Sequence, residues 1–282
     1  MTDQEFGVST HLFHNSQLTR DHLGHIARHG FRAVELFATR SHFDYRDSSA
    51  IARLAEWLRQ ANLTLHSVHA PIFEAFRGGQ GIGSFSIAAG DDVLRRAAVG
   101  EIREAIRLAD HVPYRFLVVH VGTSARDSKD LDNRRDAARR SVDDIAPLAA
   151  EAGIRIALEV IPNPLSSASM LVSFIEDDLD TPDVGICLDY GHAHLMGDLG
   201  EAIETISGHL STTHVHDNGG RQDDHLVPFE GTIDWDAAMM ETQKIGYDGV
   251  LMLEVADTGN PLEVLRQAAQ ARDRLEKTFV TF

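Results

Sequence analysis

Carboxylate and imidazole side chains recur at the ends of short apolar runs along this chain of 282 residues. In CLDYGHAH, residues 187–194, the apolar run stops at Asp189 and two histidines follow. Glu159 ends the run IRIAL, and Glu254 ends VLML. Buried carboxylates are costly unless they are paired or coordinate a cation. Carboxylate and imidazole together are a normal ligand set for Mn²⁺, Mg²⁺, Zn²⁺ or Co²⁺, so the pattern predicts a divalent metal site.

A regular alternation of strand-like and helix-like segments must position these side chains. Apolar, β-branched runs predict eight strands, at 6–12, 32–38, 63–69, 114–121, 154–160, 184–190, 211–217 and 249–255. Segments with helical spacing predict helices near 18–29, 47–61, 91–111, 130–152, 166–178, 198–208, 234–245 and 261–277. Ser16 and Asp234 stand where helices should start, and Gly30, Gly153 and Gly246 where helices should end.

Eight strand–helix units in this length favour a single (β/α)₈ TIM barrel domain that spans residues 1–282. A doubly wound open sheet is the alternative, because periodicity does not separate the two. The longest irregular stretches are 70–90 and 217–233. Long loops in compact domains are usually functional or mobile, and the glycines of the first stretch indicate a mobile lid.

Polar side chains lie near the ends of all the predicted strands. They are His11, Glu35, His69, His120, Glu159, Asp189, His214, His216 and Glu254. The carboxyl ends of barrel strands converge on one mouth, so these residues can meet in space. One histidine alone would more often be a hydrogen-bonded structural residue, and one glutamate could pair with an arginine. Their recurrence on successive strands favours a metal or catalytic carboxylate site.

The charge and composition of the chain limit the kinds of partner and the cellular location that we expect. The net charge of −17 disfavours nucleic acid, because an acidic surface repels phosphates. No run approaches the roughly 18 apolar residues of a membrane span, and the first residues lack the pattern of a secretory signal. Cys187 is the single cysteine, which fits a reducing cytoplasm. We therefore expect a cytoplasmic protein, and a homo-oligomer stays open.

Five segments, in this order and spacing, resemble the xylose isomerase-like TIM barrel superfamily. They are HSVHAP (66–71), ALEV (157–160), CLDYGHAH (187–194), THVHDNGGRQDDHLVPFEGTIDW (213–235) and LMLEV (251–255). This superfamily holds sugar and sugar-phosphate isomerases and epimerases together with apurinic endonucleases. The resemblance implies one divalent metal held by Glu159, Asp189, His214 and Glu254. His214 is preferred to His216 because the family's ligand histidine stands three residues before an acid, here Asp217.

The resemblance to the epimerase branch also implies a reaction. Glu159 and Glu254 would be the catalytic pair that moves a proton beside a carbonyl, through a metal-stabilised enediolate. The substrate would be a small sugar or sugar phosphate. His192 corresponds to the family's substrate-contacting histidine. The family's arginine falls on Gly220, with Arg221 one residue further on. The predicted substrate-binding residues are these two, His192 and Arg221, together with His216, His11 and Glu35 from the strand ends.

The endonuclease branch gives the alternative function, a multi-zinc phosphodiesterase-like hydrolase or a lyase. Its further metal ligands correspond to His69, His120, Asp223 and His225, which could instead bind sugar hydroxyls. The acidic charge disfavours a DNA substrate. A sugar-binding protein without activity is the third possibility, but such a protein has no need for two glutamates across one metal.

Overall fold

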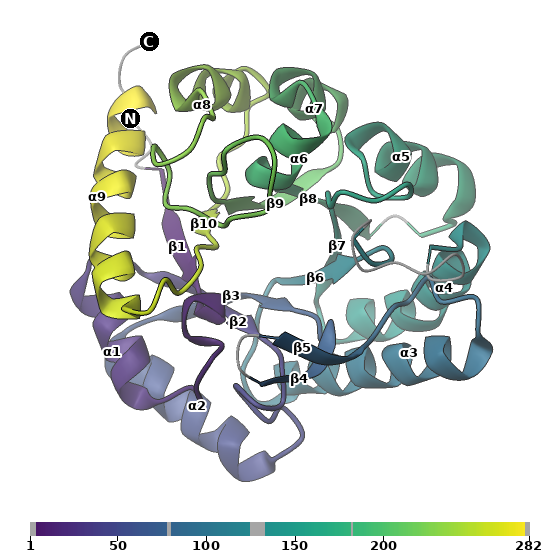
Figure 1. Ribbon diagram of the computed structural model, residues 1–282. Helices are drawn as coiled ribbons and strands as arrows, with labels where there is room; N and C mark the ends of the chain where they lie inside the picture. The colour runs from purple at the N-terminus through teal and green to yellow at the C-terminus, as the bar shows by residue number, and fades with distance from the viewer. Residues whose placement is uncertain (1–3, 78–79, 125–132, 182, 280–282) are drawn as a thin grey trace.

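Eight parallel strands close into a barrel at the centre of the molecule (Figure 1). The computed structural model describes residues 4–77, 80–124, 133–181 and 183–279. The strands follow the order β1-β10-β9-β8-β7-β6-β3-β2 around the barrel. They are β1 (Phe6–Ser9), β2 (Ala33–Phe37), β3 (Thr64–His69), β6 (Phe116–His120), β7 (Arg155–Glu159), β8 (Val184–Asp189), β9 (Leu210–Val215) and β10 (Leu251–Leu253). The TIM barrel prediction is confirmed, and the open sheet is excluded because β1 pairs with both β2 and β10.

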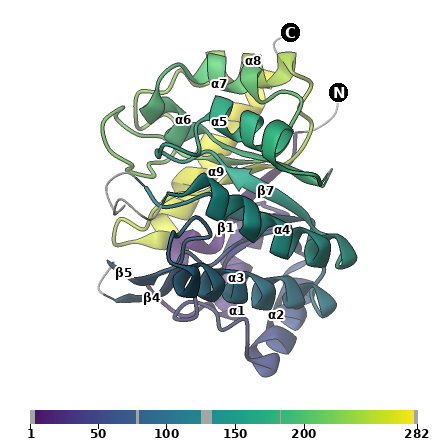
Figure 2. The same ribbon diagram turned by 90° about the vertical axis from the view of Figure 1, so that its right-hand side faces the viewer.

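Helices surround the barrel and cover its outer surface (Figures 1 and 2). They are α1 (Arg20–Arg28), α2 (Ser48–Ala61), α3 (Asp92–Arg107), α4 (Arg135–Glu151), α5 (Ala168–Ser173), α6 (Tyr190–Met196), α7 (Leu199–Thr205), α8 (Trp235–Lys244) and α9 (Pro261–Phe279). Short turns of other helix types precede or extend some of them: η1 (Thr10–Phe13), η2 (Leu108–Asp110) and η3 (Phe174–Asp178). Among the described helices, none has both the length and the apolar composition to cross a membrane.

Local sequence signals explain where several helices begin and end. Asp234 caps α8 as predicted, because its side chain accepts a hydrogen bond from the backbone of Ala237. The cap of α1 is Thr19, and the predicted start at Ser16 is wrong. Gly30, Gly153 and Gly246, which follow helices, all have positive φ, a conformation that glycine adopts without strain.

The structure corrects several predicted element bounds. The first strand ends at Ser9, so His11 lies in the turn η1 and not in a strand. The predicted sixth strand ends at Asp189, and residues from Tyr190 form the additional helix α6. Of the predicted helix 130–152, residues 130–132 lie outside the described residues, and α4 begins at Arg135.

The segment 70–90 was predicted to be irregular, but much of it forms an antiparallel hairpin. Its strands are β4 (Phe73–Arg77) and β5 (Gln80–Ser84), which pair with each other and not with the barrel. The side view shows this hairpin at the left edge of the molecule (Figure 2), and Figure 1 shows it next to β2 and β3. Its glycines hide the alternation of side chains by which strands are recognised in a sequence.

His42, in the segment between β2 and α2, makes the stability of the fold depend on pH. Its Nδ1 donates a hydrogen bond to the carbonyl of Ser16 (2.7 Å), and its side chain is buried. Within the described residues, its Nε2 has no hydrogen-bond partner. Burial lowers the pKa of His42 to about 4. The folded protein therefore holds this ring neutral, while the unfolded chain binds a proton near pH 6.5.

We expect the stabilisation from neutral His42 to be complete above pH 6.5 and to disappear as the pH falls toward 4. Between these pH values, the uptake of one such proton on unfolding changes the unfolding free energy by about 1.4 kcal/mol per pH unit. His42→Asn retains a donor for Ser16 but does not titrate, so its unfolding free energy should change less steeply with pH. Urea unfolding between pH 6.5 and 5 measures this, and equal slopes for both proteins would contradict the assignment.

Candidate metal and active site

The carboxyl ends of four neighbouring strands bring the predicted metal ligands together. Glu159 and Asp189 end β7 and β8, His214 lies near the end of β9, and Glu254 directly follows β10. Asp189 and His214 are register partners on adjacent strands. Each of the four is at most 3% exposed. One ligand atom from each lies within 4.8 Å of the others, so these residues form a compact cluster of donors, here the four-ligand cluster.

The centre of the four-ligand cluster is Nδ1 of His214. This atom lies 3.2 Å from Oε1 of Glu159, 3.3 Å from Oε2 of Glu254 and 3.9 Å from Oδ2 of Asp189. Burial alone would raise the pKa of Glu159, but His120 and His214 hold it well below its usual value. Burial alone would lower the pKa of His214, but the surrounding acidic groups raise it well above its usual value. Such concentrated negative charge, centred on one imidazole nitrogen, suits a cation.

Glu159 also belongs to a second cluster, with His69 and His120. Its Oε2 lies 3.0 Å from Nε2 of His120 and 3.3 Å from Nε2 of His69. Yet within the described residues this buried oxygen has no hydrogen-bond partner. A buried carboxylate oxygen that faces two imidazole nitrogens without a hydrogen bond fits a shared metal ligand. Oε1 of Glu159 therefore faces the four-ligand cluster, and Oε2 faces His69 and His120.

A third cluster contains His192, His216, Asp223 and His225. Asp223 lies at its centre, with Oδ2 3.1 Å from Nε2 of His192 and Oδ1 3.3 Å from Nε2 of His225. The rings of His216 and His225 stack with centroids 3.9 Å apart. Nε2 of His216 lies 2.9 Å from Oδ1 of Asp189, which connects this cluster to the four-ligand cluster. All three clusters therefore adjoin at the barrel mouth.

The loop 217–233 brings Asp223 and His225 to the mouth, and Asp217 anchors this loop. Asp217 is buried, and its carboxylate accepts hydrogen bonds from the backbone N–H groups of Asn218, Phe229 and Ile233 and from the indole of Trp235. Its backbone also pairs with Leu226. From the sequence, Asp217 was used only as the acid that distinguishes His214 from His216 as the predicted metal ligand. Its role as an anchor depends on contacts that no local pattern shows.

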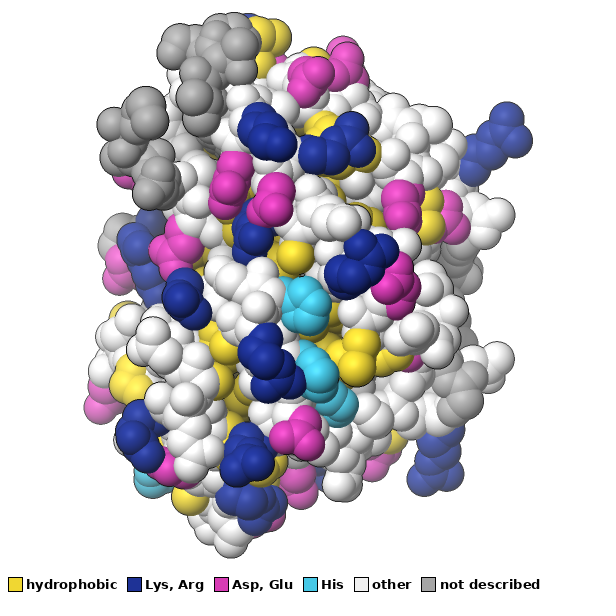
Figure 3. Space-filling view, turned by 90° about the vertical axis from the view of Figure 1, so that its left-hand side faces the viewer, with side chains coloured by type: hydrophobic (Ala, Val, Ile, Leu, Met, Phe, Trp, Pro, Cys, Tyr) yellow, Lys and Arg dark blue, Asp and Glu magenta, His cyan; other side chains and the backbone are white. Residues whose placement is uncertain are grey.

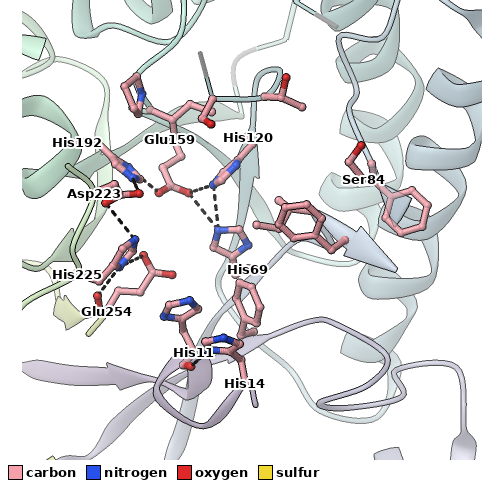
Figure 4. Close-up of a pocket in the computed structure, with 18 of the residues that line it drawn as sticks. His11, His14, His69, Ser84, His120, Glu159, His192, Asp223, His225 and Glu254 are labelled. Atoms are coloured by element: carbon pink, nitrogen blue, oxygen red, sulfur yellow. Dashed lines mark hydrogen bonds and ion pairs between the residues drawn. The ribbon is translucent and has the colours of Figure 1, made fainter. Parts of the chain in front are cut away.

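A cavity of about 440 Å³ opens above the clusters, a size typical of small-molecule sites. Figure 4 shows His192, Asp223, His225 and Glu254 on one side of it and Ser84 on the opposite side. Aromatic side chains form the other side: Phe37 from β2, and Phe73, Phe76 and Phe85 from the hairpin region. No pattern in the sequence places these phenylalanines at the site, although Phe73 and Phe76 are large apolar residues in an otherwise glycine-rich segment.

The hairpin is attached to the segment that follows β2. Arg40 pairs with Glu74 at 2.8 Å, and the backbone N–H of Phe76 donates to the hydroxyl of Ser41 at 3.0 Å. Phe76 also packs edge-on against His14, which lines the cavity. The hairpin thus forms one wall of the cavity, and its mobility as a lid stays a prediction.

The predicted substrate-binding residues occupy different depths. His192 and His11 line the cavity. His216 and Glu35 are fully buried and lie outside the lining of the cavity. Arg221 is exposed on the loop 217–233 and also lies outside the lining. The structure therefore places two of the five against the space where a substrate would bind.

Protonated histidines make metal binding at these clusters depend on pH. Burial alone would lower the pKa of His225, but Asp223 raises it to about 9. Burial also opposes a charge on His192, but Asp189 and Asp223 raise its pKa well above the usual value. These rings hold protons at pH 7, and a metal ligand must lose its proton from the bound nitrogen.

We therefore expect zinc binding to release protons and to strengthen by about tenfold per pH unit for each proton released, between pH 7 and 9. Titration calorimetry at one pH, in buffers that differ in ionisation enthalpy, counts the protons. Equal heats in all the buffers would show that the clusters bind zinc without losing a proton, or that they do not bind it.

Comparison with known proteins agrees with this fold. The sequence matches the xylose isomerase-like TIM barrel family over residues 23–277, so the chain belongs to that family. It is 31% identical to the uncharacterized protein MJ1311 of Methanocaldococcus jannaschii, over 94% of this chain and 89% of that one. It is 22% identical to an inosose isomerase of Bacillus velezensis, over 86% and 84% of the two chains.

A solved structure described as a D-tagatose 3-epimerase-like protein superposes with a TM-score of 0.79 at 27% identity. The match covers 98% of this chain and 97% of that one. An inosose isomerase and a protein described as epimerase-like are thus among the neighbours of this chain in sequence and in structure.

Proposed function

We propose that this protein is a divalent-metal-dependent sugar isomerase or epimerase. The observation that carries the proposal is the placement of Glu159 and Glu254. Both belong to the four-ligand cluster, both line the cavity, and they reach it from different strands (Figure 4). Two carboxylates beside one bound sugar can remove and return a proton at a carbon next to a carbonyl. The named neighbours support the same reaction class.

Different residues would have different roles in the proposed reaction. A divalent cation held by Glu159, Asp189, His214 and Glu254 would supply positive charge beside the carbonyl oxygen, which makes the adjacent C–H more acidic. Glu159 and Glu254 would exchange the proton with that carbon. His192 and His11 line the cavity and can hydrogen-bond sugar hydroxyls. The phenylalanines would pack on the apolar face of the ring and exclude water.

The proposal makes a chemical demand that hydrolysis does not. A substrate should exchange a carbon-bound proton with solvent, which NMR detects as deuterium uptake beside the carbonyl in D₂O. The metal-loaded protein would be incubated with a panel of ketoses, ketose phosphates and a keto-cyclitol. Uptake with at least one compound supports the proposal. No uptake across the panel, together with hydrolysis of a phosphodiester, would overturn it.

The second candidate is a multinuclear metal hydrolase that cleaves phosphate esters. The observation that favours it is the presence of two further donor clusters, one of which shares Glu159 with the four-ligand cluster. Neighbouring metal ions are suited to clamp the attacking and leaving oxygens of a phosphoryl group. Elemental analysis of protein purified without chelator separates the candidates. One ion per chain favours the isomerase, and three ions with hydrolysis of bis-p-nitrophenyl phosphate favour the hydrolase.

We expect no useful binding to duplex DNA at about 0.15 M salt. The net charge is −17, and on the face that carries α9 the basic side chains are mixed with acidic ones (Figure 3). Pairs such as Arg266 with Glu263 and Arg272 with Asp273 reduce the charge available to phosphates. A mobility-shift assay with an abasic-site duplex tests this. Salt-sensitive binding with strand cleavage would place the hydrolase first.

A further inference from the structure

Glu35 lies beneath the four-ligand cluster and holds the far side of His214. Oε2 of Glu35 accepts a hydrogen bond from Nε2 of His214 at 3.0 Å and another from the hydroxyl of Ser67 at 2.8 Å. Glu35 and His214 are both 0% exposed. Glu35 is on β2 and reaches β9 across the barrel interior, because β1 and β10 lie between these strands. Its neighbour on the same face, Phe37, lines the cavity one layer above.

The two nitrogens of His214 therefore face different partners. Nδ1 faces the three carboxylates of the four-ligand cluster, and Nε2 faces Glu35. A hydrogen bond from Nε2–H to Glu35 keeps a proton on that nitrogen, so Nδ1, which lies 3.2 Å from Oε1 of Glu159, is the nitrogen that would give up its proton when a metal binds. The position of Glu35 thus selects the tautomer of the ring in which Nδ1 is the metal ligand.

Three other histidines of the clusters have a backbone carbonyl beside Nδ1. Nδ1 of His69, His192 and His225 lies 2.9, 3.2 and 2.8 Å from the backbone carbonyls of Ala70, Val160 and Glu254, which leaves Nε2 toward the clusters. A carbonyl is a neutral acceptor, whereas Glu35 brings a full negative charge. Within the described residues, Oε1 of Glu35 has no hydrogen-bond partner. The hydrogen bonds that compensate the charge of Glu35 all reach its other oxygen, Oε2, and come from His214 and Ser67.

We propose that Glu35 is a positioning residue that orients His214 and increases its affinity for the metal. This inference rests on the proposed metal site. It assigns Glu35 to the metal centre rather than to the substrate. A carboxylate that hydrogen-bonds a ligand histidine fixes the ring and makes the coordinating nitrogen more basic, and its loss typically weakens metal binding by about 10- to 100-fold.

The test compares Glu35→Gln with the matched variant Glu101→Gln. Glu101, on α3, is also a buried glutamate and accepts hydrogen bonds of 2.6 Å from Tyr45 and from Arg46, but it lies outside all three donor clusters. The dissociation constant for Zn²⁺ would be measured on the full chain by competition with a chromogenic chelator. We expect about 10- to 100-fold weaker binding for Glu35→Gln and binding within about twofold of the wild type for Glu101→Gln.

Circular dichroism of the metal-free proteins reports whether each variant folds. If Glu35→Gln does not fold, Ser67→Ala replaces it, because this variant keeps the carboxylate but removes its second hydrogen bond. We expect Ser67→Ala to weaken zinc binding by a smaller factor, on the order of several-fold. Wild-type affinity in the folded variants would overturn the role of Glu35. A wild-type protein that binds no divalent metal would instead overturn the proposed metal site itself.

Nitrogen-15 NMR of the zinc-loaded protein gives a readout that a purely structural role would not affect. Long-range proton–nitrogen correlations show which ring nitrogen of His214 carries the proton. We expect the proton on Nε2 and the metal on Nδ1. A zinc-loaded wild type with the proton on Nδ1 would overturn the inference even if Glu35→Gln weakens binding.

Discussion

Glu254→Gln is expected to slow the exchange of the substrate's carbon-bound proton with solvent by a factor on the order of 10² or more. Glu254 lines the cavity, is 3% exposed, and places Oε2 3.3 Å from Nδ1 of His214. Glutamine keeps the size and shape of the side chain but cannot accept a proton as a base. The rate is followed by NMR in D₂O with a confirmed substrate.

Metal content must be measured on the same sample, because Glu254 is also a predicted ligand. A suitable control is Glu176→Gln, since Glu176 is an exposed glutamate that pairs with His209 at 3.0 Å outside the barrel mouth. It should exchange at the wild-type rate. If Glu254→Gln keeps its metal and also exchanges at the wild-type rate, Glu254 is not part of the proton-transfer pair.

Glu159→Gln is expected to have the larger effect on metal binding, because Glu159 serves two clusters through different oxygens. Loss of its charge should weaken zinc binding at the four-ligand cluster by at least about 100-fold and disturb the cluster of His69 and His120 as well. The stabilisation of the protein by zinc should fall with it. That stabilisation is about 4 kcal/mol when free zinc is 1,000 times the dissociation constant.

Thermal unfolding with and without zinc, together with metal analysis, measures both effects. Glu254→Gln is the matched comparison, because it removes a carboxylate from the four-ligand cluster but leaves His69, His120 and Glu159 in place. We expect Glu159→Gln to lose more metal than Glu254→Gln. Equal losses would show that Glu159 contributes to one cluster only, and wild-type metal content would remove it from the ligands.

That Glu159, Asp189, His214 and Glu254 lie together could be predicted from the sequence, because the carboxyl ends of barrel strands are neighbours in space. Glu159, Asp189 and Glu254 each follow a strongly apolar run, so the place where each side chain meets the mouth can be read directly. The depth at which a side chain lies within the barrel could not be predicted in this way. Glu35 and Phe37 share one face of β2, yet only Phe37 lines the cavity. The stagger between neighbouring strands decides which layer of the barrel a side chain occupies. The alternation of side chains along a single strand gives no information about this stagger.

The phenylalanines that line the cavity could not be predicted from the sequence either. The strands β4 and β5 pair only with each other, and their glycines and charged residues interrupt the alternation typical of a half-buried strand. Their place beside the mouth depends on contacts such as Arg40 with Glu74, which are distant in sequence. Likewise, the spacing of His214 and His216 predicts a shared face, but not that His216 would join Asp223 and His225 in a separate cluster.

The anchoring of the loop 217–233 by Asp217 has a consequence for the entropy of binding. Ordering one residue of a flexible loop costs about 1–2 kcal/mol, and a loop that orders around its ligand loses this amount from the binding free energy. Here the hydrogen bonds of Asp217 and the backbone pairing with Leu226 order the loop when the chain folds. Asp223 and His225 are therefore in place before any ligand arrives. Ligand capture at this side of the mouth should have a small entropic penalty and little change in backbone order.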